Sequence, residues 1–111
     1  MKEKFLPIGT VCKVRNSDKT VMITGYLGIS NSDNSAVFDY SGCGYPEGIL
    51  ASNMMIAFNH SEITEVLSEG YKNDDAKGFI ELIKTAVAND ESPADIEKQI
   101  DTLYFTEIEK L

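Results

Sequence analysis

The feature of this sequence that most constrains its fold is a change in the spacing of apolar residues near position 72. Before that point apolar side chains alternate with polar ones, as in half-buried strands. From Asn73 onward they recur three and four positions apart, which is typical of amphipathic helices. The change predicts an α+β fold in a single domain at 1–111, mainly β over 1–71 and helical and acidic over 72–111.

About five strands are expected in the first region. Residues 8–15 and 20–27 alternate on either side of a polar turn and predict a hairpin, in which Gly25 predicts a bulge. We expect a third strand at 36–40, followed by a glycine-rich loop at 41–48. The apolar run at 54–58 predicts a central strand, and 64–71 predicts a last one. Together they predict a small twisted antiparallel sheet, which could form a partly open barrel.

Three helix starts are visible in the sequence. Asn59 is a candidate cap for a single turn at 60–62. Asn73 begins a helix whose apolar face consists of Phe79, Leu82, Ile83, Ala86 and Val87. Ser92, followed by Pro93 at the first helical position, begins a second helix that could reach the C-terminus. The apolar face of this final helix comprises Ile96, Ile100, Leu103, Tyr104, Ile108 and Leu111.

The charge of the chain is concentrated in its second half. The net charge is −8; residues 1–50 carry five Lys or Arg and five Asp or Glu, whereas 51–111 carry five and thirteen. Such a surface repels nucleic acid and suits a basic or amphipathic protein partner, although solubility alone would also explain it. No apolar run is long enough for a membrane span or a signal peptide. We therefore expect a cytoplasmic protein with neither nucleic acid nor membrane as its partner.

The side chains that could carry chemistry are Cys12, Cys43 and His60. The two cysteines lack C-x-x-C spacing, so free thiols are expected. Cys43, between two glycines, could be a nucleophile with His60 as its base, and the three residues together could bind zinc. Acidic surroundings disfavour a thiolate, and the scattered spacing fits a metal site poorly. We therefore expect no catalytic residue, no metal and no cofactor.

The chain contains, in order, Leu-Pro-Ile-Gly-Thr-Val at 6–11, Val-Met-Ile-Thr-Gly-Tyr at 21–26, Phe-Asp-Tyr-Ser-Gly-Cys-Gly-Tyr-Pro-Glu-Gly at 38–48, Phe-Asn-His-Ser-Glu-Ile at 58–63 and Glu-Gly-Tyr at 69–71. In that order these five segments resemble a family of small bacterial domains of unknown function. This family occurs mainly in Gram-positive bacteria, often in type VII secretion loci beside LXG polymorphic toxins. The resemblance extends over approximately residues 5–85, and where the family tends to read Asn-His-Glu-Asp this chain has Asn-His-Ser-Glu at 59–62.

This resemblance implies a toxin-associated accessory, adaptor or chaperone-like protein rather than an enzyme. Our hypothesis is a non-enzymatic adaptor that binds the N-terminal helical region of an LXG toxin and keeps it competent for export. The alternatives are an immunity protein that neutralises a cognate toxin and a small enzyme that uses Cys43 and His60; the oligomeric state is left open. The expected partner-binding residues are Tyr40, Cys43, Tyr45, Pro46, Glu47, Asn59, His60, Tyr104, Ile108 and Leu111.

Overall fold

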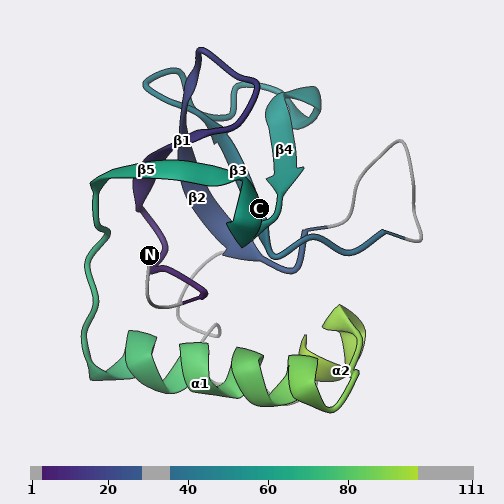
Figure 1. Ribbon diagram of the computed structural model, residues 1–111. Coiled ribbons are helices and arrows are strands. Elements are labelled where there is room, and N and C mark those ends of the chain that lie inside the picture. Colours follow the sequence, from purple (N-terminus) through teal and green to yellow (C-terminus); the bar gives the residue numbers. More distant parts are fainter. Residues whose placement is uncertain (1–3, 29–35, 98–111) are drawn as a thin grey trace.

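The computed structural model describes residues 4–28 and 36–97, and its main element is a five-stranded antiparallel sheet (Figure 1). Its strands lie in the order β4-β3-β2-β1-β5, so β4 and β5 form the two edges. The expected α+β class is confirmed, but the sheet is open rather than closed into a barrel. The strands are β1 (Val11–Val14), β2 (Thr20–Tyr26), β3 (Tyr40–Gly44), β4 (Met55–Phe58) and β5 (Ile63–Ser68).

In the described part of the chain, two α-helices follow the sheet, α1 (Asp74–Ala88) and α2 (Pro93–Glu97). The Asn73 side chain accepts a hydrogen bond from the Ala76 N–H at 2.9 Å, and the Ser92 hydroxyl accepts one from the Asp95 N–H at 3.2 Å. These bonds satisfy backbone donors at the helix starts and confirm both predicted caps. Neither helix in the described part of the chain has the length and apolar character needed to cross a membrane. The predicted continuation of the final helix beyond residue 97 lies outside the described residues.

The hydrophobic core lies between one face of the sheet and α1, which runs beneath the sheet in Figure 1. The N-terminal segment passes between these two layers and adds Phe5 and Leu6 to the core. Phe79 and Val87, predicted on the core face of α1, stay 36% and 41% exposed at its margin. The buried side chains are Cys12, Val21, Ile23, Tyr40, Phe58 and Ile63 from the sheet region, and Ile80, Ile83, Ala86 and Ile96 from the helices.

The third strand differs from its predicted position. It begins at Tyr40 and runs to Gly44, so the first half of the sequence expected to form a loop lies inside the sheet. A Cβ on Gly42 would lie 2.6 Å from the Met22 carbonyl oxygen and 3.0 Å from the Phe58 ring. Glycine is therefore needed here for close packing of neighbouring strands, rather than for a flexible turn.

The strand predicted at 54–58 is also placed differently. It forms β4, which is an edge strand instead of a central one, and its Met55 and Ile56 are 48% and 39% exposed. An apolar run does not by itself distinguish the two positions, because pairing depends on strands far away in the sequence. The bulge predicted at Gly25 is confirmed, since the register of β2 against β3 shifts between Ile23 and Gly25.

Candidate functional site

An aromatic cluster joins the N-terminal segment, the sheet and α1, with the fully buried ring of Tyr40 at its centre. The centroid of this ring lies 5.5 Å from that of Phe58, 6.1 Å from that of Phe5 and 5.9 Å from that of His60. Tyr26 lies between this cluster and the helix, because its ring centroid is 6.1 Å from both the Tyr40 ring and the Phe79 ring. Aromatic pairs of this kind contribute ~0.5–1.5 kcal/mol each beyond the area they bury.

The hydroxyl of Tyr40 connects the backbone of Leu6 to the ring of His60. It accepts a hydrogen bond from the Leu6 N–H at 2.9 Å and lies 2.8 Å from His60 Nδ1. Because the N–H can only donate, the hydroxyl proton is available to Nδ1, and a neutral His60 then carries its own proton on Nε2. The Tyr26 hydroxyl donates to the Leu6 carbonyl at 2.7 Å. Both backbone polar groups of Leu6 are thus satisfied by tyrosine hydroxyls.

Asp39 and Asn59 extend this polar network. The Asp39 carboxylate accepts the His60 N–H at 2.9 Å and lies 3.2 Å from Lys4 Nζ. The Asn59 side-chain oxygen accepts the Asp39 N–H at 3.0 Å. It therefore holds the start of β3 and makes no capping bond to the turn at His60–Glu62, which corrects the predicted cap. The Phe-Asp-Tyr and Phe-Asn-His motifs meet at this point and stabilise each other.

The protonation states of Tyr40 and His60 follow from their surroundings. Burial raises the pKa of Tyr40 to about 12, although the backbone hydrogen bonds at its hydroxyl oppose that shift. Burial also lowers the pKa of His60 from its ordinary value, against the attraction of the Asp39 carboxylate. At neutral pH the phenol is protonated and the imidazole neutral, which is the combination that the hydroxyl-to-Nδ1 bond requires. This network holds the fold together, and its central hydroxyl has no open surface for a substrate.

The two cysteines lie on opposite faces of the sheet. Cys12 is fully buried in the core, and burial raises its pKa to about 11. Cys43 is 1% exposed and lies three residues after Tyr40 in β3, so strand alternation directs it to the face opposite the Tyr40–His60 pair. Within the described ranges, no three His, Cys, Asp or Glu side chains are grouped to hold a metal ion.

The other sequence-predicted site residues separate according to their exposure. Tyr45, Pro46 and Glu47 lie on the exposed turn after β3, where Glu47 forms an ion pair with Lys19. Asn59 and His60 are half-buried, and Tyr104, Ile108 and Leu111 lie outside the described residues. Among the predicted residues that the structure describes, Tyr40 therefore meets the half-buried His60, with Asn59 beside them, whereas the turn at 45–47 is accessible.

The sequence stretch 45–56, which we name the apolar loop, runs from the turn after β3 into the first two residues of β4 and exposes more large side chains than the motif analysis indicated. Besides Tyr45, which is 49% exposed, it presents Leu50 at 84% and Met55 at 48%. Ile49 and Ile56 are also exposed. The sequence signal that could have identified Ile49 and Leu50 is their place directly after Gly48, where two apolar residues stand outside any strand.

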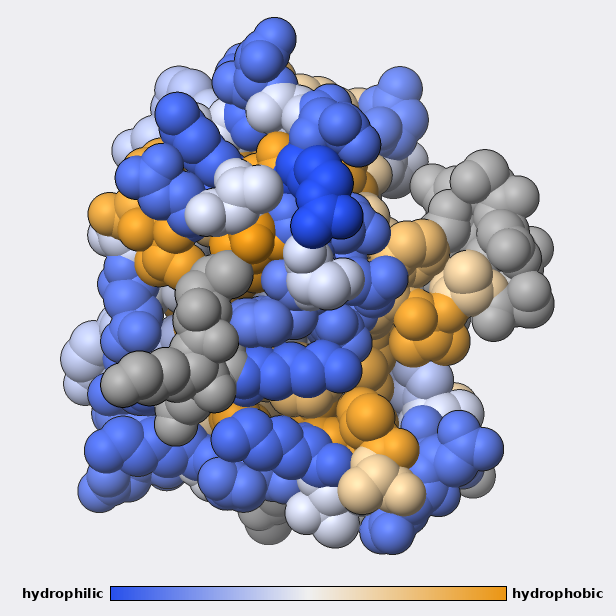
Figure 2. Space-filling view, viewed as in Figure 1, coloured by the Kyte–Doolittle hydropathy of each residue, from blue (hydrophilic) through white to orange (hydrophobic). Residues whose placement is uncertain are grey.

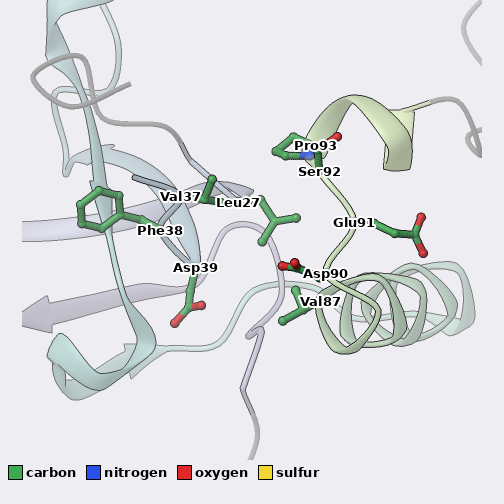
Figure 3. Close-up of a pocket in the computed structure, with 9 residues that line it drawn as sticks. All are labelled: Leu27, Val37, Phe38, Asp39, Val87, Asp90, Glu91, Ser92 and Pro93. Atoms are coloured by element: carbon green, nitrogen blue, oxygen red, sulfur yellow. The ribbon is translucent and has the colours of Figure 1, made fainter. Parts of the chain in front are cut away.

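A second surface feature, which sequence analysis missed, is a groove between the sheet and the end of α1. It consists of two hollows of about 380 Å³ and about 340 Å³ that share Leu27 and Pro93 as lining residues. Figure 3 shows the larger hollow, with Leu27 and Val37 on the sheet side facing Val87 and Asp90. The lining residues come from separate parts of the sequence, so no single motif marks this groove.

Comparison with protein families gave one finding. The family model for a domain of unknown function, DUF4176, matches residues 5–79 of the chain. Comparison with curated proteins and with solved structures gave no match. The matched range contains the aromatic cluster and the apolar loop.

Proposed function

The chain belongs to the DUF4176 family of domains of unknown function, and we propose that it is a non-enzymatic, cytoplasmic adaptor. Its partner in this proposal is the N-terminal helical region of an LXG toxin, which it keeps competent for type VII secretion. The partner class rests on the motif resemblance described above. The structure adds which side chains are exposed at the surface that such a partner would contact.

The observation that carries the proposal is the contrast between buried reactive groups and exposed apolar ones. Cys43 and Tyr40 are enclosed, whereas Tyr45, Leu50 and Met55 of the apolar loop are about half exposed or more. Large exposed apolar side chains in one stretch mark interaction sites more often than catalytic ones. Tyrosine and methionine are also enriched in interfaces, because they bury much area at a low entropic cost or adapt to uneven surfaces.

The charge of the chain fits the same role. With a net charge of −8, the protein attracts basic partners at long range and repels other acidic molecules. Near the apolar loop the ion pair of Lys19 and Glu47 neutralises local charge, so apolar contacts there meet no unpaired acid on the turn. The expected interface therefore has an apolar centre that binds, and the net negative charge of the protein accelerates the encounter.

The proposal is tested by co-expression with the LXG protein encoded nearest to this chain. Size exclusion and native mass spectrometry are applied to the full-length toxin and to its separately cloned halves. We expect a stable complex with the N-terminal half. Binding only to the toxic C-terminal half would instead indicate an immunity protein, and the absence of any complex would refute both roles.

The role of the apolar loop is tested with alanine variants of the chain. The double variant Tyr45→Ala, Leu50→Ala removes two exposed side chains and is expected to weaken binding about tenfold or more. The matched control is Tyr71→Ala, because Tyr71 is 83% exposed and lies between β5 and α1. Equal affinities of the double variant and the control would exclude the loop from the interface.

A further inference from the structure

The groove between the sheet and α1 is apolar on both sides. Figure 3 shows Leu27 and Val37 directed across the hollow toward Val87 and Pro93, whereas the ring of Phe38 turns away. Val37 is 51% exposed and Val87 is 41% exposed, so both can contact an incoming molecule. On the face shown in Figure 2, apolar surface gathers at the right-hand side beside the end of α1, within mostly hydrophilic surroundings. The smaller hollow continues this surface with Ile8, Tyr26, Phe79, Ile83 and Ile96.

The backbone at Leu27 adopts an uncommon conformation. Its φ is 57°, a left-handed value that a leucine rarely adopts. Backbone bonds on both sides hold this conformation, since the Leu27 N–H donates to the Asp39 carbonyl and the Phe38 N–H donates to the Gly28 carbonyl. Strained residues of this kind are concentrated at binding sites. Here the conformation places an apolar side chain in the wall that both hollows share.

Among the described residues that line the groove, the charged side chains are all acidic. These acids are Asp39, Asp90 and Glu91, and the described lining residues include no Lys or Arg. Lys4 lies beside the Asp39 carboxylate, and Figure 3 shows Asp90 at the edge of the hollow with Glu91 directed outward. The adjoining sequence 85–97 holds four acids and no basic residue. An occupant that carried acids would be repelled, which disfavours a second copy of this chain with its net charge of −8.

We propose that this groove binds an apolar segment of the partner protein in which Lys or Arg residues flank the apolar side chains, as in a basic amphipathic helix. This inference rests on the proposed function, because it assumes a protein partner. Volumes of about 380 Å³ and about 340 Å³ accommodate a few side chains each. Such a size fits the anchors that one helix presents at successive turns. The acidic edge of the groove, which we define as Asp90 and Glu91, then attracts the Lys or Arg residues of the segment and sets its orientation.

The first test is the Kd between the full chain and the N-terminal half of the LXG toxin. Val87→Lys places a cation in the groove and is expected to weaken binding about tenfold or more. Leu67→Lys is the matched control, because Leu67 on β5 is 46% exposed and receives the same change of charge. The control is expected to leave the Kd unchanged, and circular dichroism verifies that both variants fold.

The second test concerns the acidic edge. The double variant Asp90→Asn, Glu91→Gln is expected to weaken binding about threefold or more and to reduce the dependence of the association rate on salt. Asparagine at position 90 tolerates the φ of 58° found there. Glu65→Gln with Glu69→Gln removes the same charge elsewhere and is expected to have a smaller effect. If the two double variants weaken binding equally, the acids act only through the overall charge of the protein. That result would contradict the proposed pairing with basic flanks.

The outcomes separate the groove from the proposed function. If the wild-type chain forms no complex, the proposed function and the proposed role of the groove both fail. If the wild-type chain binds and Val87→Lys binds equally well, only the role of the groove is excluded. Photo-crosslinking from p-benzoylphenylalanine in place of Val37 identifies the occupant. Crosslinks to an apolar toxin segment with flanking Lys or Arg would support the proposal. Crosslinks to residues 98–111 of the same chain, or to a second copy, would overturn it.

Discussion

Replacing Tyr40 with Phe removes one oxygen atom and keeps the aromatic packing. The Leu6 N–H then loses its acceptor at 2.9 Å, and His60 Nδ1 loses its donor at 2.8 Å. Leu6 is 8% exposed, so its N–H stays unpaired without local opening, at a cost of ~1–3 kcal/mol. The His60 ring is half-buried and its Nδ1 can recruit water, so the loss of the hydrogen bond from the Tyr40 hydroxyl costs ~0.5–1.5 kcal/mol. Tyr40→Phe should therefore lower the free energy of unfolding by about 1.5–4.5 kcal/mol.

The same substitution should raise the pKa of His60. In the wild type, burial lowers this pKa, and the hydroxyl bond to Nδ1 favours the neutral ring in the same direction. Without that bond the neutral form loses a partner, whereas the Asp39 carboxylate continues to attract the protonated form. Because His60 is the one histidine of the chain, its NMR resonances report this pKa without ambiguity.

Urea unfolding and NMR titration of the wild type, Tyr40→Phe and Tyr71→Phe test both effects. Tyr71 is 83% exposed, so its variant controls for loss of a phenol and should leave stability and the pKa of His60 unchanged. The Tyr40 variant should also melt roughly 6–18 °C lower, at about 4 °C per kcal/mol for a chain of this size. A loss below about 0.5 kcal/mol together with an unchanged pKa of His60 would refute the bridging role of the hydroxyl.

Three further predictions follow from burial and close packing. Gly70→Ala would bring a Cβ to 2.1 Å from the Ile8 carbonyl oxygen, so we expect a loss above about 3 kcal/mol or failure to fold, measured by soluble yield and circular dichroism; a stable variant would contradict the packing. Gly78→Ala in α1 meets no atom within 4 Å and should stabilise the protein by ~0.5–1 kcal/mol in thermal unfolding; a loss of stability would contradict an open site there. The free energy of unfolding should fall above pH 9, because burial raises the pKa of Cys12 from 9.0 to about 11 and that of Tyr40 from 10.0 to about 12. Each group loses its proton at lower pH in the unfolded chain than in the folded protein. The stability is therefore complete below the pKa of the unfolded group and is lost as the pH rises through the pKa of the folded group, by ~2–3 kcal/mol for each group. Urea unfolding from about pH 8 to about pH 12 measures this, and constant stability over that range would contradict the burial of both groups.

The features that were predicted correctly are local in the sequence. The caps at Asn73 and Ser92 act on backbone groups three residues away, so the residue type and spacing suffice to recognise them. The α+β class follows from the periodicity, and the bulge at Gly25 from a glycine inside a strand. Two of the wrong predictions concern β3 and β4, whose placement depends on which strands pair. Local preferences of a Gly-x-Gly sequence favour a loop, and here the close packing of neighbouring strands places it in a strand instead. The predicted Asn59 cap was also wrong, because its side chain binds the distant Asp39 N–H instead.

The candidate site was predicted less completely. The motif around 38–48 was identified, but the sequence did not show which of its side chains are exposed. Tyr40 and Cys43 are enclosed, and Leu50 is the most exposed of the large apolar side chains in the apolar loop. Sequence patterns indicate that a residue is apolar or reactive, and burial depends on what the rest of the chain places over it. The groove beside α1 was missed for the same reason, because its two walls belong to different layers of the fold.

By itself the sequence determined where strands give way to helices and where each helix begins, since both depend on side chains within a few positions of each other. Only the tertiary structure decided which residues are accessible. It joined Leu6 to Tyr40 across 34 positions and Tyr40 to His60 across 20. It also set Leu27 and Val37 opposite Val87. These contacts form only when the sheet, the N-terminal segment and α1 bury a common core, because such distant groups have no local reason to meet.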